Sequence, residues 1–284
     1  MDRILADAAA MKGERGRHTA QPLAGQTWAL IFSKSSTRTR VSFEVGVSEL
    51  GGRPMFLSAT DIQMGRGEPV KDTARVLGRM VHGAVFRTFA QRDVEEFAQQ
   101  AGIPTINALT DEEHPCQILA DILTIQEKRG PMAGKIVTFI GDGACNVANS
   151  WMFAAARLGF ELRIAAPKDF QPSPALRRRA EGRILATEDV NAASNGADVL
   201  YTDVWVSMGK EGESAERLKA LAGYQINAAT LAPAKPNALV MHCLPAYRGR
   251  EIDEVTFEAH ARTIFDQAEN RLHAQKAILN WAVS

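Results

Sequence analysis

Short apolar runs alternate with helical patterns through most of the chain, and this alternation restricts the possible folds more than any other feature. In the first half, strands are predicted at Thr27–Phe32, Met55–Leu57, Ala84–Phe86 and Thr105–Asn107, with helices at Val41–Leu50, Pro69–Met80 and Val94–Ala101 between them. Short strands joined by helices are typical of a parallel sheet covered by helices. A helical pattern over 114–128 is predicted to bridge two domains, because 284 residues are long for one core.

The same alternation starts again after residue 134. Strands are predicted at Ile136–Ile140, Leu162–Ala166, Val199–Trp205 and Leu239–Cys243, with helices at Val147–Leu158 and near Arg271–Trp281. We therefore predict an α/β protein made of two open parallel-sheet domains joined by bridging helices. In such sheets ligands bind beyond the carboxyl ends of the strands, so functional side chains are expected directly after the strands.

Composition narrows the class of protein. Lys plus Arg and Asp plus Glu both number 33, so the formal net charge is zero, which argues against nucleic acid or an anionic membrane as the main partner. No apolar run reaches about 18 residues, the length of a membrane span, and we predict a cytoplasmic protein. Cys116, Cys145 and Cys243 form no C-x-x-C pair, which favours reduced thiols over a disulfide framework or a metal site.

The junction Ser36–Arg40 separates a predicted strand from a predicted helix. Ser36 and Thr37 are residue types that cap helices, and the first N–H groups of a helix attract anions. Arg38 adds a planar fork that can hold a phosphate with two hydrogen bonds. The junction lacks the glycines and lysine of a P-loop. The alternative is a well-capped surface helix in which Arg40 pairs with Glu44.

Five motifs in this order resemble those of the aspartate/ornithine carbamoyltransferase family. They are Ser36–Arg40; Gln63 with Lys71–Leu77; His114–Gln117; Asp203–Gly209; and His242–Pro245. The resemblance implies the carbamoyltransferase fold, with carbamoyl phosphate bound by residues 1–128, L-ornithine bound by 129–266, and a C-terminal helix, 267–284, packed back on the first domain. It implies carbamoyl transfer to the δ-amine of ornithine, giving citrulline and phosphate in arginine biosynthesis, without a cofactor. It also implies domain closure within a homotrimer of shared active sites.

The resemblance assigns roles to residues on the carbamoyl phosphate side. The phosphate is expected to bind Ser36, Thr37, Arg38, Thr39, Arg87 and, from a neighbouring subunit, Gln63. The carbamoyl group is expected to contact Arg87, His114, Gln117, Cys243, the carbonyl of Leu244 and Arg271. Attack by an amine builds negative charge on the carbonyl oxygen and then on the phosphate, so donors are needed at both. The catalytic residues implied are Arg87, His114 and Cys243.

The amino-acid side is expected at Asn146, Asp203, Ser207 and Met208. An α-amino acid needs an acceptor for its ammonium and donors for its carboxylate. Asp203 with the Ser207 hydroxyl supplies the first, and the Asn146 amide with the Met208 N–H supplies the second. Aspartate would require an added cation, so this set favours ornithine.

Other interpretations exist for the same residues. Gly141–Gly143 follows a strand as in nicotinamide-dependent oxidoreductases, but the series is G-x-G-x-x-N. No acidic residue stands at the end of the next strand, Leu162–Ala166, to hold a ribose. A non-catalytic phosphate-binding protein is a second alternative, and N-acetylornithine or putrescine could replace ornithine. Taken singly, His114 could merely begin its helix, Cys243 could be a small core residue, and Gln63 could face solvent.

Overall fold

A computed structural model describes residues 1–17 and 19–284. The chain forms two compact units, a first unit of Met1–Leu123 with Glu269–Ser284 and a second unit of Thr124–Ala268. The helices α5 (Pro115–Arg129) and α11 (Glu254–Ala282) each contribute residues to both units.

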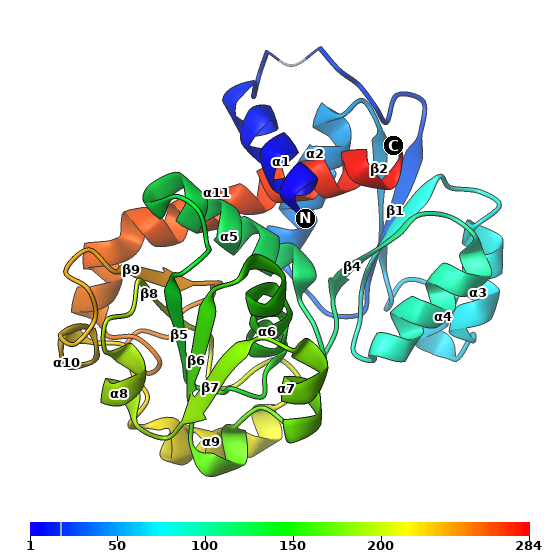
Figure 1. Ribbon diagram of the computed structural model, residues 1–284. Coiled ribbons are helices and arrows are strands. Elements are labelled where there is room, and N and C mark those ends of the chain that lie inside the picture. Colours follow the sequence, from blue (N-terminus) through cyan, green and yellow to red (C-terminus); the bar gives the residue numbers. More distant parts are fainter. Residues whose placement is uncertain (18) are drawn as a thin grey trace. The chain divides into compact units, whose positions relative to one another are not determined.

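The first unit is built on a parallel sheet with the strand order β2–β1–β3–β4. Its strands are β1 (Thr27–Phe32), β2 (Arg53–Ser58), β3 (Gly83–Arg87) and β4 (Thr105–Leu109). Its other helices are α1 (Asp2–Gly13), α2 (Thr37–Glu49), α3 (Val70–Leu77), α4 (Gln91–Ala101) and the 3₁₀ helix η1 (Gln63–Arg66). Figure 1 shows α3 and α4 on one side of this sheet, and α1, α2 and the end of α11 on the other.

Alternate residues of β1 explain why both faces of this sheet are covered. Trp28, Leu30 and Phe32 pack with residues of α2 and α11, whereas Ala29 and Ile31 pack with residues of α3 and α4. A strand buried on both faces is an unbroken apolar run, as the sequence of β1 is. At the start of β3, a Cβ on Gly83 would lie 2.6 Å from the Trp28 ring, so only glycine fits beside that tryptophan.

The second unit is built on a parallel sheet with the order β7–β6–β5–β8–β9. Its strands are β5 (Ile136–Ile140), β6 (Glu161–Ala165), β7 (Arg183–Thr187), β8 (Val199–Thr202) and β9 (Leu239–His242). Its other helices are α6 (Asn146–Leu158), α7 (Pro174–Ala180), α8 (Val190–Ser194), α9 (Ser214–Leu221), α10 (Ala228–Leu231) and the 3₁₀ helices η2 (Lys168–Phe170) and η3 (Glu211–Glu213).

Helices again cover both faces of the sheet, with α6 and α8 on opposite sides (Figure 1). Trp151 of α6 lies edge-on to Tyr201 of β8, with ring centroids 5.5 Å apart. On the other face, Thr138 of β5 donates from Oγ1 to the Ala193 carbonyl of α8 at 2.7 Å. Both sheets are parallel and helix-covered, which confirms the predicted fold class.

Several predicted elements differ in extent from the observed ones. Helix α11 has 29 residues and begins at Glu254, well before the predicted start near Arg271, because Phe257 and Ile264 are buried in the core of the second unit. Strand β8 ends at Thr202 rather than at Trp205, since the Asp203 carboxylate accepts the Val204 N–H at 2.7 Å and turns the chain. Strand β7 was not predicted; it lies at the sheet edge and is partly exposed.

Among the described residues, no helix is long and apolar enough to cross a membrane.

Candidate active site

The junction Ser36–Arg40, called the cradle below, contains the N-terminus of α2. Ser36 is the N-cap in extended conformation, and its Oγ accepts the N–H of Thr39 at 3.2 Å. The Ser42 hydroxyl donates to the Arg38 carbonyl at 2.6 Å and tightens the first turn. Arg40 pairs instead with Glu44 at 2.9 Å, and its guanidinium lies over the Phe56 ring at 3.6 Å. The two arginines of the motif therefore have different environments.

Arg271 links three helices beside this cradle. From α11 it donates to the Gln117 side-chain oxygen of α5 at 2.6 Å and to the Thr39 hydroxyl of α2 at 3.0 Å. Gln117 in turn donates to Asp121 at 2.7 Å. Thr39, Gln117 and Arg271, which lie far apart in the sequence, are thus brought together, and neutral partners orient the Arg271 charge.

Arg87 ends β3 and is almost completely buried. Its register against β4 shifts at this point, since Phe86 faces Asn107 and Arg87 faces Leu109. Burial, together with the charges of Arg271 and then Arg38, lowers the Arg87 pKa to about 10. The guanidinium stays charged at neutral pH, and its buried Nε has no hydrogen-bond partner among the residues that the structure describes. A buried cation in such surroundings calls for an anion.

His114 is buried beside the same arginines. Burial lowers its pKa well below the usual value, and the charges of Arg271 and then Arg87 add to this effect. The imidazole is therefore neutral at physiological pH, and it can act as a hydrogen-bond donor without adding positive charge. His114 also precedes α5 and its carbonyl accepts the Gln117 N–H at 3.1 Å, so the helix-start interpretation holds together with the electrostatic one.

Lys34 was not among the predicted site residues. Its buried ammonium pairs with Asp111 and lies 4.4 Å from the centroid of the Phe89 ring. Lys34 lies in the loop between β1 and Ser36, and Asp111 lies in the loop between β4 and His114. Phe89 lies in the loop that follows Arg87 at the end of β3. Its position two residues before Ser36 was the signal that could have identified it.

In the second unit, the expected residues follow three neighbouring strands. Asn146 follows β5 as the first residue of α6, Asp203–Met208 follow β8, and Cys243 and Leu244 follow β9. These strands are adjacent and parallel in the sheet, so all of these residues lie beyond the carboxyl ends of the strands.

Asp203 and Cys243 are in direct contact. The Cys243 thiol donates to Asp203 Oδ1 at 2.9 Å. Burial raises the Asp203 pKa, against the opposing effects of His242, the Cys243 hydrogen bond and the Val204 N–H, while Glu251 raises it further. Cys243 is only partly buried, so the interpretation as a simple core residue does not describe it.

The backbone after β9 is held by a buried network. Leu244 has a left-handed φ of 58° and precedes a cis peptide bond to Pro245. Its N–H donates to His242 Nδ1 at 2.8 Å, so the His242 proton lies on Nε2, which faces Glu251 Oε1 at 3.2 Å. Glu251 also accepts the Tyr247 N–H. This network fixes the orientation of the Leu244 peptide group.

Ser207, Met208 and Gln63 are less constrained. The Ser207 carbonyl accepts the Lys210 N–H at 3.0 Å, and the Met208 side chain is exposed. Gln63 is exposed on the 3₁₀ helix η1. No hydrogen bond among the described residues joins the Gln63 side chain to the cradle.

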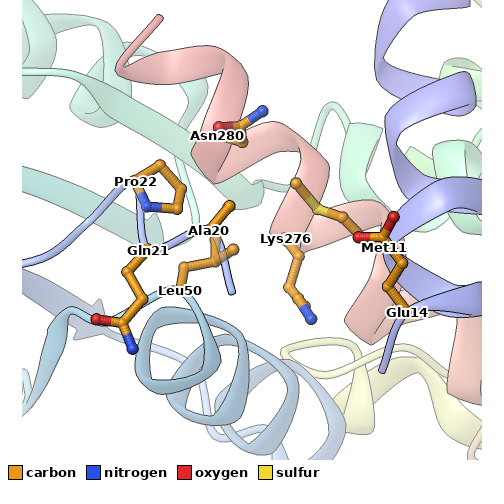
Figure 2. A pocket seen from close by; sticks show the side chains of 8 residues that line it. All are labelled: Met11, Glu14, Ala20, Gln21, Pro22, Leu50, Lys276 and Asn280. Atoms are coloured by element: carbon orange, nitrogen blue, oxygen red, sulfur yellow. The ribbon is translucent and has the colours of Figure 1, made fainter. Parts of the chain in front are cut away.

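The first unit also contains a cavity with a volume of about 400 Å³. Figure 2 shows its lining, which consists of Met11, Glu14, Ala20, Gln21, Pro22, Leu50, Lys276 and Asn280. The Lys276 ammonium is paired with Glu49 at 2.7 Å. None of the predicted site residues lines this cavity.

The two helix-covered parallel sheets define a two-domain α/β protein. It carries a cationic cluster at a helix N-terminus of the first unit. The family model for the carbamoyl-P binding domain of aspartate/ornithine carbamoyltransferase matches residues 1–127, and the model for the Asp/Orn binding domain matches residues 133–282. The chain belongs to the aspartate/ornithine carbamoyltransferase family. This membership replaces the oxidoreductase interpretation of Gly141–Gly143.

Similar proteins cover nearly the whole chain. An ornithine carbamoyltransferase of Akkermansia muciniphila is 60% identical over 279 residues, which span 97% of this chain and 92% of that protein. The crystal structure of the anabolic ornithine carbamoyltransferase of Campylobacter jejuni superimposes with a TM-score of 0.92 at 42% identity, covering 98% of this chain and 93% of that one. The crystal structure of the Gloeobacter violaceus ornithine carbamoyltransferase superimposes with a TM-score of 0.88 at 45% identity, covering 100% of this chain and 94% of that one.

Proposed function

We propose that this protein is an ornithine carbamoyltransferase, which transfers the carbamoyl group of carbamoyl phosphate to the δ-amine of L-ornithine and releases citrulline and phosphate. The observation that carries the proposal is the cluster of Arg38, Arg87 and Arg271 with neutral His114 at the N-terminus of α2. The family membership and the names of the similar proteins support the same reaction.

The first unit supplies the groups that carbamoyl phosphate needs. Ser36, Thr37, Arg38 and Thr39 bind the phosphate, because the helix N-terminus and the guanidinium both favour a dianion. Arg87 spans phosphate and carbonyl oxygen, and neutral His114 donates to that oxygen as negative charge develops on it. Gln117 and Arg271, already hydrogen-bonded to each other, bind the carbamoyl amide and its oxygen.

The second unit supplies the groups that ornithine needs. Asp203 and Ser207 accept the α-ammonium, and Asn146 and the Met208 N–H bind the α-carboxylate. Cys243 lies beside the attacking amine, and the Leu244 carbonyl contacts the carbamoyl group. N-acetylornithine lacks the ammonium that Asp203 requires, and putrescine lacks the carboxylate that Asn146 requires, so both are poorer substrates.

The chemical step is direct displacement. The lone pair of the δ-amine attacks the carbamoyl carbon, a C–N bond forms, the C–O bond to phosphate breaks, and the amine loses a proton. No covalent enzyme intermediate is needed. Because such an amine has a pKa of about 10.4 in water, only its small unprotonated fraction reacts at neutral pH.

The proposal includes the biological setting. The protein acts in the cytoplasm in arginine biosynthesis, in keeping with the anabolic Campylobacter jejuni protein that it resembles. It works as a homotrimer in which Gln63 of one subunit completes the phosphate site of the next. Residues 1–128 with 267–284 bind carbamoyl phosphate, and residues 129–266 bind ornithine.

One experiment tests the reaction and its specificity. The purified protein is incubated with carbamoyl phosphate and, separately, ornithine, N-acetylornithine, putrescine or aspartate, and the carbamoylated product is measured by mass spectrometry. We expect citrulline, with kcat/KM for ornithine at least about 100-fold above that for the other amines. N-acetylornithine and putrescine each lack a charged contact, and the second carboxylate of aspartate would require an added cation. Phosphate release without citrulline, or a preference for another amine, would refute the proposal.

A further inference from the structure

Arg217 lies on α9, outside every motif of the sequence analysis, and its guanidinium is buried in the second unit. Its side chain is 9% exposed and that of its partner Asp142 is 11% exposed. Nε donates to the Trp205 carbonyl at 2.7 Å, and Nη2 pairs with Asp142 Oδ2. Arg217 therefore joins the segment that follows β8 to the turn that follows β5.

Each joined segment carries part of the proposed ornithine site. Asp142 Oδ1 accepts the Ala144 N–H at 3.0 Å, and the Asp142 carbonyl accepts the Cys145 N–H at 3.3 Å, which fixes the turn leading into Asn146. Trp205 lies midway between Asp203 and Ser207 in the sequence. One guanidinium thus contacts both of the segments that carry the residues proposed to bind the ammonium and the carboxylate of ornithine.

We propose that the Arg217–Asp142 pair is a positioning pair that sets the affinity of the protein for its amino-acid substrate. The inference rests on the proposed function and assigns neither residue a contact with the substrate. A planar guanidinium donates in fixed directions, so it can hold two segments at one spacing. Because both charges are buried, neither can leave the pair without exposing an uncompensated charge to an apolar interior.

Further contacts restrict Arg217 to this orientation. Nη1 lies 3.4 Å from Glu213 Oε2, and the guanidinium lies 4.9 Å from the centroid of the Phe170 ring. The arginine is therefore held on several sides, and its hydrogen bond to Trp205 is directed rather than incidental.

The second unit offers a matched control in Arg163 of β6. Its side chain is 15% exposed, it pairs with Glu161 at 2.7 Å, and it donates to the carbonyls of Ala193 and Asn195. Arg163 thus has the same chemistry and similar burial, but it joins β6 to α8 and contacts neither segment of the proposed site. Arg163→Met should cost stability without changing substrate affinity.

The test compares Arg217→Met, Asp142→Asn and Arg163→Met in steady-state kinetics. We expect the KM for ornithine to rise about 10- to 100-fold in the first two variants and to stay unchanged in the third, since small displacements of binding groups have large effects. The KM for carbamoyl phosphate should change by less than about threefold in all three. The double variant Asp142→Asn/Arg217→Met should be scarcely worse than either single one, because the two residues act as one unit.

Hydrogen–deuterium exchange gives a readout that does not depend on turnover. Exchange at residues 142–146 and 203–209 should become faster in Arg217→Met and stay unchanged in Arg163→Met. If Arg217→Met does not fold, Asp142→Asn, which keeps the side-chain volume, decides the question. Unchanged ornithine KM in a folded variant, an equal rise in both KM values, or the same effect in Arg163→Met would overturn the inference. Wild-type protein that makes no citrulline would instead refute the proposed function, and the exchange data would still test the link between the two segments.

Discussion

Arg38 and Arg40 are two residues apart on α2, yet their surroundings differ. Arg40 is exposed and paired with Glu44 within the helix. Arg38 is half-buried, makes no ion pair among the described residues, and contributes to lowering the pKa of Arg87. Only Arg38 therefore has the setting of an anion ligand.

We predict that Arg38→Ala weakens carbamoyl phosphate binding by one to two decades. Loss of a charge-assisted contact typically costs about 1.5–3 kcal/mol, whereas an exposed pair such as Arg40–Glu44 contributes under about 1 kcal/mol. Calorimetric titration with carbamoyl phosphate, or with a stable phosphonate analogue, measures the dissociation constant. Arg40→Ala is the matched control, and equal affinities for the two variants would contradict the prediction.

At the scale of elements, the cap of α6 is weak for a helix that begins at the proposed site. Its N-cap is Cys145, whose sulfur accepts the Ala148 N–H at 3.5 Å. Burial raises the pKa of the Cys145 thiol, with Asp142 and Asp203 adding to the effect, so the sulfur stays a neutral and poor acceptor. Serine is a preferred capping residue of similar size.

We predict that Cys145→Ser stabilises the protein by about 0.5–1 kcal/mol, because the hydroxyl accepts the same N–H more strongly. Differential scanning calorimetry should show a melting temperature higher by about 1–4 °C. Cys116→Ser is the contrasting substitution, since Cys116 lies in the apolar core of the first unit and should lose stability. A fall in melting temperature for Cys145→Ser would show that the sulfur packs better than it caps.

At the scale of the whole molecule, three buried or partly buried histidines are expected to make stability depend on pH. Burial lowers the pKa of His114, His260 and His273. In the unfolded chain these groups titrate near about 6.5, so below that pH the unfolded state binds more protons than the folded state. Their contribution to stability is present above the unfolded pKa and is lost as the pH falls toward the folded values.

We predict that the melting temperature falls as the pH is lowered from about 7.5 to 5.5, the window set by the unfolded histidine pKa. His273→Gln should flatten this dependence, since burial of the His273 side chain lowers its pKa against the opposing effect of Glu269 at 3.1 Å. Calorimetry of both proteins across the range measures the difference. A pH dependence that is identical in the two would exclude His273 as a contributor.

Assembly is a second property of the whole molecule. Gln63 lies exposed on η1, and no hydrogen bond among the described residues connects its side chain to the cradle of its own chain, as a residue acting on a neighbouring subunit would require. A closed three-fold ring would give each η1 one neighbouring cradle.

We predict that mixing Gln63→Ala and Arg38→Ala subunits restores part of the activity lost at low carbamoyl phosphate concentration, because some hybrid sites combine an intact Gln63 with an intact Arg38. The double variant mixed with itself under the same exchange conditions should restore nothing. Light scattering gives the oligomeric state in parallel. A monomer, or no recovery after subunit exchange has been verified, would exclude the shared site.

The sequence by itself determined the elements that depend on local pattern. The unbroken apolar run of β1, the alternation of strands and helices, and the capping residue Ser36 each act over a few residues. Most strand positions, the fold class and the capped start of α2 could therefore be predicted. Strand β7 and the short helices α7 to α10 were missed, because an edge strand and one- or two-turn helices carry too little periodicity. The start of α11 was missed because its apolar positions are spaced among many charges.

The tertiary structure alone decided which distant residues act together. Arg271 is hydrogen-bonded to Thr39, 232 residues away in the sequence, and to Gln117, 154 residues away. Arg217 is paired with Asp142, 75 residues away. Burial, which lowers the pKa values of Arg87 and His114 and raises that of Asp203, is likewise a property of the packed fold. Local patterns fix which segments fold into strands and helices, whereas charge, protonation and contact depend on what the assembled sheets and helices bring within a few ångströms.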